Sequence, residues 1–224
     1  MPDTPPPDRA PLDAAHIVAT AMTLADADGV ESLTMRRLAD ELGYKVMALY
    51  RHVANKDELL RLMVDAIAGT IPTPDPAVAP LRGIREHAIA THDVFMRHPW
   101  VPTLWLRHVP GPHRQDHMEY LLAAFDRSGL PDDLAHHGFH AVNNHVLGYT
   151  LQAREMAAGL DDEPMEEAAS RFIASLDPTD HARTIAHVQQ HLDGDTGASF
   201  ELVLDLILDG LVRLAEDRAR LTEN

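Results

Sequence analysis

The chain has 224 residues, no cysteine and a formal net charge of −16 at pH 7. This length allows one large or two small domains with a real hydrophobic core, and the lack of cysteine excludes disulfide bonds, thiolate metal sites and cysteine nucleophiles. No apolar run approaches the roughly 18 residues of a membrane span, and the N-terminus lacks the basic and apolar segments of a signal peptide, so a cytoplasmic protein without a membrane partner is predicted.

The N-terminal segment and the first helix are set apart by their composition. Five prolines fall in the first eleven residues, so residues 1–11 are predicted to be a disordered arm. Asp13 is a typical helix-capping residue, and the apolar residues after it recur at helical spacing until Gly29. Order is therefore expected to begin near residue 12.

Two short helices and a longer one are expected next. Thr34 can cap a short helix over 35–42, and a second short helix follows over 45–52. Asn55 can cap the longer helix, which must end near Ile71 because prolines stand at positions 72, 74, 76 and 80. The proline-rich stretch predicts a boundary between a domain over 12–71 and a domain over 80–224.

The second domain is also expected to be helical. Its apolar residues keep helical spacing, and no run alternates like a strand or carries hairpin turn chemistry. Helices are predicted over 81–97, 102–108, 114–128, 132–157, 165–175 and 198–219, with a weaker one near 180–192. The predicted fold class is all-α.

The stretch from 33 to 60, LTMRRLADELGYKVMALYRHVANKDELL, has the pattern of a helix-turn-helix. Gly43 supplies the positive φ that such a turn needs. In this motif the first helix braces against the DNA backbone and the second enters the major groove. Residues 34–61 are also locally positive, with six Lys or Arg against four Asp or Glu. The side chains expected to face inward are Leu38, Ala39, Leu42, Val46 and Leu49.

This stretch resembles the DNA-binding domain of the TetR (tetracycline-repressor) family of transcription regulators, over about residues 12–70. The resemblance rests on Gly29, Leu33–Thr34, Arg36–Ala39, Leu42–Gly43, Leu49–Tyr50, His52, Asn55–Lys56 and Leu59–Leu60. The rest of the chain resembles the tetracycline-repressor type of C-terminal domain, through RHPWVPTL (97–104), HAVNNHVLGYTLQ (140–152) and FELVLDLILDGL (200–211). The resemblance implies a homodimeric repressor with N-terminal DNA-binding domains, which leaves its double-stranded DNA operator when a small-molecule effector binds the C-terminal domain.

By position, the family's DNA contacts fall on Thr34, Arg36, Lys45, Val46, Met47, Ala48, Tyr50, Arg51, His52 and Lys56. Three of these, at positions 46 to 48, offer no strong hydrogen-bonding group, so their readout would be apolar, as against thymine methyl groups. Lys45 and Arg36 are then the candidates for reading guanine. Arg37 has an even chance of being structural, and Tyr44 stands where the family usually has a small aliphatic residue.

The last helix is unusually apolar. Between Phe200 and Leu214 its apolar side chains fill an arc of roughly 200°, about twice what a helix buried on one side needs. This arc predicts burial against both the chain's own core and a second subunit, the alternative being a central helix of a monomer. With the helix over 132–157, it is expected to form a four-helix bundle across a two-fold axis.

A ligand pocket is expected between the proline-rich stretch and the dimer helices. Aromatic walls with a few polar groups suit a largely apolar, drug-sized molecule, whereas plain core positions are the alternative at this spacing. The candidates are His92, Phe95, Met96, Trp100, Trp105, Phe139, Asn143 and Tyr149.

Fifteen histidines are many for this length, and three pairs have the i, i+4 spacing at which two rings can share a metal ion. The pairs are His113/His117, His136/His140 and His187/His191. No HExxH motif, phosphate loop or nucleotide fingerprint is present, so no metal, cofactor or catalytic residue is predicted. Two alternatives to the repressor stay open: a regulator of this fold that binds a ligand or a protein but has lost DNA affinity, and a histidine-based metalloenzyme.

Overall fold

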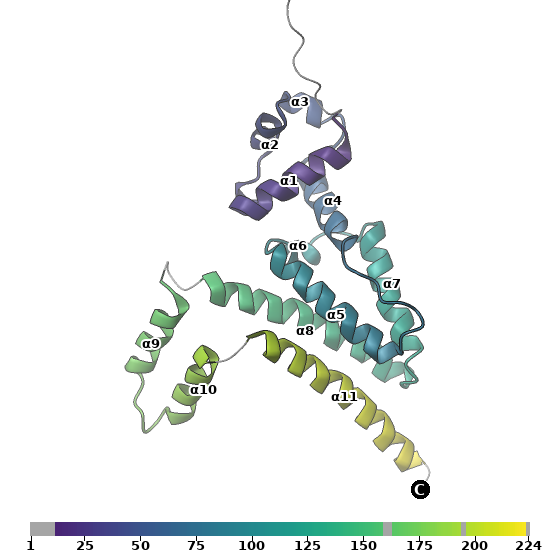
Figure 1. Cartoon of the computed structure of the whole chain (residues 1–224), viewed down its shortest axis with the longest axis vertical. Helices are drawn as coiled ribbons and strands as arrows, with labels where there is room; N and C mark the ends of the chain where they lie inside the picture. Colours follow the sequence, from purple (N-terminus) through teal and green to yellow (C-terminus); the bar gives the residue numbers. More distant parts are fainter. Residues whose placement is uncertain (1–11, 159–162, 194–195, 223–224) are drawn as a thin grey trace, which may run out of the picture.

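The computed structural model of the chain describes residues 12–158, 163–193 and 196–222, and this part is helical with no strand (Figure 1). The predicted arm over 1–11 lies outside the described residues. The all-α prediction is confirmed, and the bounds of the expected helices differ from those found by three residues or fewer. The helices are α1 (Ala14–Asp28), the 3-10 helix η1 (Val30–Ser32), α2 (Met35–Leu42), α3 (Val46–Leu49), α4 (Lys56–Ala68), α5 (Pro80–Arg97), α6 (Val101–Trp105), α7 (Pro112–Asp126), α8 (Asp132–Ala158), α9 (Met165–Ser175), α10 (Ala182–Asp193) and α11 (Thr196–Thr222).

Helices α1 to α4 form the upper part of Figure 1, which is called the head below. Side-chain caps fix where its helices begin. The side chains of Asp13, Thr34 and Asn55 each accept the backbone amide three residues further on, over 2.8, 3.1 and 2.8 Å. Such a cap satisfies one of the amides that a first turn leaves open, and it is worth about 1 kcal/mol. All three caps were expected from the sequence.

Helices α5 to α11 form the rest of the molecule, which is called the body. Helix α8 packs against α5, α7 and α11, and α9 and α10 form a hairpin beyond its C-terminal end (Figure 1). An ion-pair cluster joins α5 to the start of α11: Arg85 bonds Asp205 over 2.6 Å and Glu201 over 2.8 Å. The guanidinium holds the pKa of the Asp205 carboxyl below its ordinary value. None of the described helices is long and apolar enough to cross a membrane.

Head and body share one continuous cluster of buried apolar side chains. Helix α4 reaches from the head into the body, where it packs against α6 and α7. A second junction lies at the end of α1. There the carboxylate of Asp26 accepts the indole N–H of Trp100 over 2.6 Å and faces Nδ1 of His98 at 2.9 Å. The head is therefore attached to the body at two points.

Helix α11 buries only one of its two apolar faces within the chain. Phe200, Leu204, Leu208 and Leu211 are buried in the core. This confirms the prediction that one apolar face of the helix packs against the chain's own core. The second apolar face points outward on the single chain and exposes Leu202, Val203, Leu206 and Leu214.

Candidate DNA-binding and effector sites

Helices α2 and α3 form the helix-turn-helix at the tip of the head (Figure 1). Gly43 ends α2 in the left-handed conformation, with φ 71°, a value that most other residues adopt only with strain. The amide of Tyr44 closes the turn by donating to the carbonyl of Ala39 over 2.9 Å. Leu38 and Leu49, one from each helix, are fully buried. The turn and the buried pair hold α3 against α2.

The side chains predicted to contact DNA are mostly exposed on this tip. Met47 is 72% exposed and Tyr50 is 41% exposed, although both are large and largely apolar. Met47 lies on the second helix of the motif and Tyr50 directly follows it, so both side chains are accessible to a DNA groove and its backbone. The exposed candidates are Thr34, Arg36, Lys45, Met47, Tyr50, Arg51 and His52, and the half-buried ones are Val46, Ala48 and Lys56.

Two neighbouring cations have different surroundings. Arg37 bonds the hydroxyl of Ser32 over 2.9 Å and forms an ion pair with Asp28, so its guanidinium ties α2 to the end of α1. Arg36, one position earlier, is exposed. Lys56 is the first residue of α4, where the free amides of a helix N-terminus also attract anions. The structure therefore assigns Arg37 a structural role and leaves Arg36 and Lys56 available to a phosphate or a base.

The body contains a cavity of about 250 Å³ beside α6, α7 and α8, which is called the Trp105 cavity. Its walls combine aromatic and apolar side chains with amides and one guanidinium, which is the composition of a small-molecule site. Leu106, at its edge, is 78% exposed. The lining residues are Trp105, Leu106, Pro110, Arg114, His117, Met118, Phe139, His140, Asn143, Asn144 and Leu147.

Arg114 is the most unusual residue of this wall, because its charged side chain is only 6% exposed. The guanidinium lies 4.8 Å from the ring centre of Trp105, and it donates to the carbonyls of Trp105 and His108, the latter over 3.1 Å. Burial lowers its pKa. Its Nε has no hydrogen-bond partner within the described residues. A buried donor of this kind is costly, so it favours a ligand that brings an acceptor.

His117 is held neutral in the same wall. Nδ1 of His87 lies 2.9 Å from the carbonyl of Pro72, and its Nε2 lies 2.8 Å from Nδ1 of His117. Because the carbonyl can only accept, the two protons sit on the Nδ1 atoms, and Nε2 of His117 remains an acceptor. Burial, then the nearby His87 and Arg114, lower the pKa of His117 to about 3.

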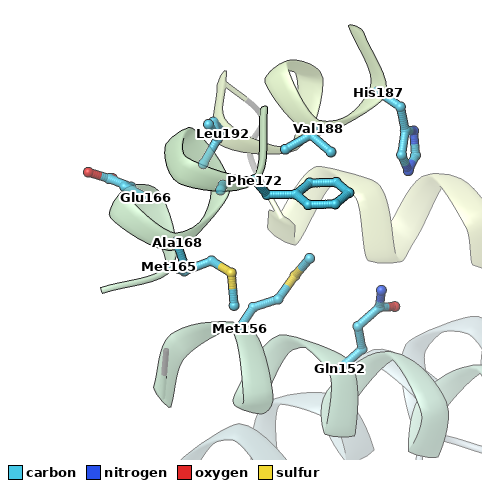
Figure 2. A pocket seen from close by; sticks show the side chains of 10 residues that line it. Gln152, Met156, Met165, Glu166, Ala168, Phe172, His187, Val188 and Leu192 are labelled. Carbon is cyan, nitrogen blue, oxygen red and sulfur yellow. The ribbon is translucent and has the colours of Figure 1, made fainter. Parts of the chain in front are cut away.

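A second cavity, of about 470 Å³, lies between the end of α8 and the hairpin of α9 and α10, and it is called the Phe172 cavity (Figure 2). The side chains of Met156 and Phe172 face each other across it, with Met165 beside them, while Glu166 points away. It is larger than the Trp105 cavity, but it is lined by α8, α9 and α10 and by no residue of α4 or α7. It therefore has no direct contact with the helices that join head and body.

Two models of one protein family match the chain, one in the head and one in the body. A family model described as bacterial regulatory proteins of the tetR family matches residues 17–63, and one described as the tetracyclin repressor-like C-terminal domain matches residues 83–214. The chain belongs to the TetR family. It is a helix-turn-helix transcriptional regulator, as the resemblance implied.

Several relatives share most of the chain with this TetR-family protein. The transcriptional repressor DrrR1 of Streptomyces coeruleorubidus is 31% identical, over 95% of this chain and 83% of its own length. The solved structure of ActR from Streptomyces coelicolor in complex with actinorhodin is 29% identical, with a TM-score of 0.78, over 92% of this chain and 99% of ActR. The class E tetracycline repressor of Escherichia coli is 27% identical, over 63% of this chain and 68% of its own length. These relatives are regulators, not enzymes.

The eight residues predicted from the sequence to bind an effector in this TetR-family chain do not all lie at one site. Trp105, Phe139 and Asn143 line the Trp105 cavity. Phe95 is a core residue behind Trp105, and Met96 is exposed on the outer side of α5. Helical spacing marks which face a residue occupies, but it does not distinguish a core position from a cavity wall.

Three of those eight residues lie elsewhere. Trp100 packs at the head–body junction, where its indole is bound to Asp26, so it is not part of the cavity wall. His92 stacks on Phe200 with ring centres 4.1 Å apart, and Tyr149 meets the same ring edge-on. These rings join α5 and α8 to α11. Arg114, His117 and Asn144 also line the cavity and are not among the eight candidates. Arg114 could not be found from the sequence, because a buried arginine has no signal of its own in a helical pattern.

The histidine pairs do not form a metal centre with a third ligand in the ranges that the structure describes. His117 faces His87 rather than His113. The rings of His136 and His140 are 4.7 Å apart on the exposed side of α8. For the third pair, the side chain of His191 lies outside the described residues.

Proposed function

We propose that this TetR-family chain is a cytoplasmic, dimeric repressor that binds a palindromic operator. It dissociates from the operator when a small molecule occupies the Trp105 cavity. In this proposal residues 12–71 form the DNA-binding domain and residues 80–224 the effector and dimer domain. The observation that carries the proposal is the helix-turn-helix at the tip of the head, with its basic and polar side chains exposed. The proposed contacts are Thr34, Arg36, Lys45, Val46, Met47, Ala48, Tyr50, Arg51, His52 and Lys56.

Charge supports this arrangement of functions. The chain carries −16 overall, whereas residues 34–61 carry a balance of +2. The acidic body repels the phosphate backbone, so electrostatic attraction between DNA and the protein is expected only at the head. Specific binding then depends on a few cations per head, among them Arg36, Lys45 and Lys56, and it is expected to be strongly salt-dependent.

The outward apolar face of α11 supports the dimer. Leu202 and Leu206 are 61% and 56% exposed on the single chain, one helical turn apart. A second copy of α8 and α11 would cover them across a two-fold axis, as in a four-helix bundle. The two heads would then face one DNA duplex, and a palindrome would match their symmetry.

The Trp105 cavity is our choice for the effector site because, unlike the larger Phe172 cavity, it borders α7, which contacts α4 of the head. Trp105, Phe139 and Asn143 form its wall with Arg114, His117 and Asn144. We expect an effector with a flat apolar body and an acceptor oxygen, such as a carboxylate, phenolate or ketone. The aromatic walls suit the body, and the unpaired Nε of Arg114 suits the oxygen.

The proposal is tested by selecting random duplexes with the purified protein at about 50 and about 200 mM salt. We expect a palindrome with half-sites about one helical turn or more apart, bound much more weakly at the higher salt. If no consensus emerges at either salt, DNA reading is refuted, and a regulator that has lost its DNA affinity becomes the better description.

Lys56→Ala and Tyr50→Ala test the assigned contacts on the selected duplex. Removing Lys56 from both heads removes two phosphate contacts, so the slope of log affinity against log salt should fall by about 2. Arg82→Ala is the matched control, because this exposed cation lies on α5 in the body. If all three variants bind like the unmodified protein, the contact assignment is wrong even where the operator is real.

A further inference from the structure

A single acidic residue lies inside the apolar packing between head and body. Asp65 stands on α4 and is only 7% exposed, between the buried Val64 and Ile67. Its carboxylate accepts the amide of Arg114 over 3.0 Å and lies 3.4 Å from the amide of His113. These amides belong to the first turn of α7. A carboxylate buried at this depth is stable only when it is paired, and here the pairing is with another helix.

The start of α7 has no cap of its own. The residue at its cap position is Gly111, which has no side chain to offer, and the first helical residue is Pro112, which has no amide hydrogen. The next two amides are those that face Asp65. The cap that most helices take from their own sequence is therefore supplied to α7 by the head.

Gly111 and Asp65 are matched in shape. A Cβ added at Gly111 would lie 2.5 Å from the carboxylate carbon of Asp65. The φ of Gly111 is −80°, a value open to every residue, so the backbone conformation does not require glycine here. Glycine is required because the Asp65 carboxylate occupies the space that a Cβ would need.

Arg114 connects this cap to the Trp105 cavity. Its backbone amide is bound by Asp65, while its side chain lies over Trp105 and lines the cavity. In the other direction, α4 leads from Asp65 back to Lys56 beside the helix-turn-helix, nine residues or about 13 Å away. A displacement of the first turn of α7 is therefore transmitted to Asp65 through a direct hydrogen bond. Helix α4 then transmits it from Asp65 to the DNA-binding surface.

We propose that Asp65 is the positioning residue of the head: by capping α7 it fixes the angle between the DNA-binding helices and the body, and it links that angle to Arg114 in the cavity wall. The effect of this angle on DNA binding rests on the proposed function, a dimer that binds DNA through its two heads. A fixed angle sets the distance between the two heads and so the half-site spacing that the dimer accepts.

The first test measures the angle without DNA or an effector. The chain has no cysteine, so Asp40→Cys on α2 and Glu119→Cys on α7, both exposed positions, can each carry one nitroxide label. Doubly labelled chains are diluted with excess unlabelled chains, and the distance distribution within one chain is measured by pulsed electron resonance. We expect a narrow distribution for the parent, a clearly broader one for Asp65→Ala, and an intermediate one for Asp65→Asn, whose side-chain oxygen still accepts.

Gly111→Ala and Asp126→Asn complete this test. The added methyl of Gly111→Ala meets the Asp65 carboxylate, so the mean distance should shift. Asp126→Asn makes the same charge change at the exposed far end of α7 and should leave the distribution unchanged. If Asp65→Asn, Gly111→Ala and a folded Asp65→Ala all give the parent's distribution, Asp65 does not position the head.

The second test uses the operator. One added base pair rotates the half-sites by about 35° relative to each other. We expect the unmodified protein to lose about tenfold or more of its affinity on such a spacer, on the scale of lost base contacts, and Asp65→Ala to bind both spacers nearly equally. A variant that is merely less stable would keep the spacing preference. Equal discrimination by both proteins overturns the coupling, whereas the absence of any operator for the unmodified protein refutes the proposed function and leaves the label test standing.

Discussion

Leu206→Glu on the outward face of α11 should dissociate the proposed dimer. Leu206 is 56% exposed on the single chain and lies in the middle of the uncovered apolar face, one turn from Leu202. A second subunit that covered this face would remove its remaining surface from water. The substitution places a carboxylate at the same position in both subunits, so the interface would have to bury two like charges.

The magnitude follows from the exposed fraction. Full burial of a leucine is worth about 1.5–3 kcal/mol. The part still exposed on Leu206 therefore contributes about 0.8–1.7 kcal/mol per chain and about 1.7–3.4 kcal/mol per dimer. At 1.4 kcal/mol for each tenfold change, the dissociation constant should rise roughly 15- to 270-fold. This range is a lower bound, because burying an unpaired carboxylate costs more than losing the methyl groups.

Sedimentation velocity over a dilution series measures the dissociation constant directly. Leu122→Glu is the matched control, since Leu122 is 40% exposed on α7 and the chemical change is identical. We expect the control to dimerise like the unmodified chain. If Leu206→Glu does so as well, the outward face of α11 is not the dimer interface, and the argument from its apolar arc is wrong.

Two further predictions concern the buried groups of the body. The pKa of His117 is lowered from 6.5 to about 3, so between these pH values the unfolded chain binds a proton at this residue and the native chain does not. The stabilisation is therefore complete above pH 6.5. As the pH falls below 6.5, the free energy of unfolding should decrease by up to about 1.4 kcal/mol per pH unit. Thermal unfolding between pH 7.5 and 5 should show a shallower decline for His117→Gln, and equal slopes would contradict the neutral buried histidine. In Trp100→Phe, which leaves Trp105 as the one tryptophan of the chain, the anionic aromatic probe anilinonaphthalene sulfonate should quench the indole fluorescence. Adding Phe139→Glu should weaken this quenching and Phe172→Glu should not, whereas the reverse pattern would move the site to the Phe172 cavity.

The helices could be predicted closely because their signals are local. Asp13, Thr34 and Asn55 cap helices at the expected positions, and each bond spans only three residues. The left-handed φ of Gly43 is likewise a property of one residue. The two faces of α11 follow from the same kind of evidence, since the arc of apolar residues is fixed by helical geometry alone.

The cavity was only partly predictable, because it depends on how helices far apart in sequence pack together. Trp100 and Trp105 look alike as aromatic residues at the two ends of the short helix α6. One is bound to Asp26 of the head, more than seventy residues earlier, and the other faces a cavity. Their difference lies in partners that no local pattern contains. Arg114 was missed for the same reason, since an arginine near a helix start is usually solvated.

Asp65 marks the boundary between what a sequence can reveal and what it cannot. At about 100° per residue it falls on the polar side of α4, with Glu58 and Arg61, so the helical pattern does not indicate that this carboxylate is buried. Its partner cannot be derived from the pattern either, because the amides become available only through two features nearly fifty residues later. Gly111 leaves the cap position empty and Pro112 starts the helix without an amide hydrogen. Each of these residues, taken alone, suggests only an ordinary helix start. Their meaning as a joint between the DNA-binding head and the body arises when α4 and α7 are packed side by side.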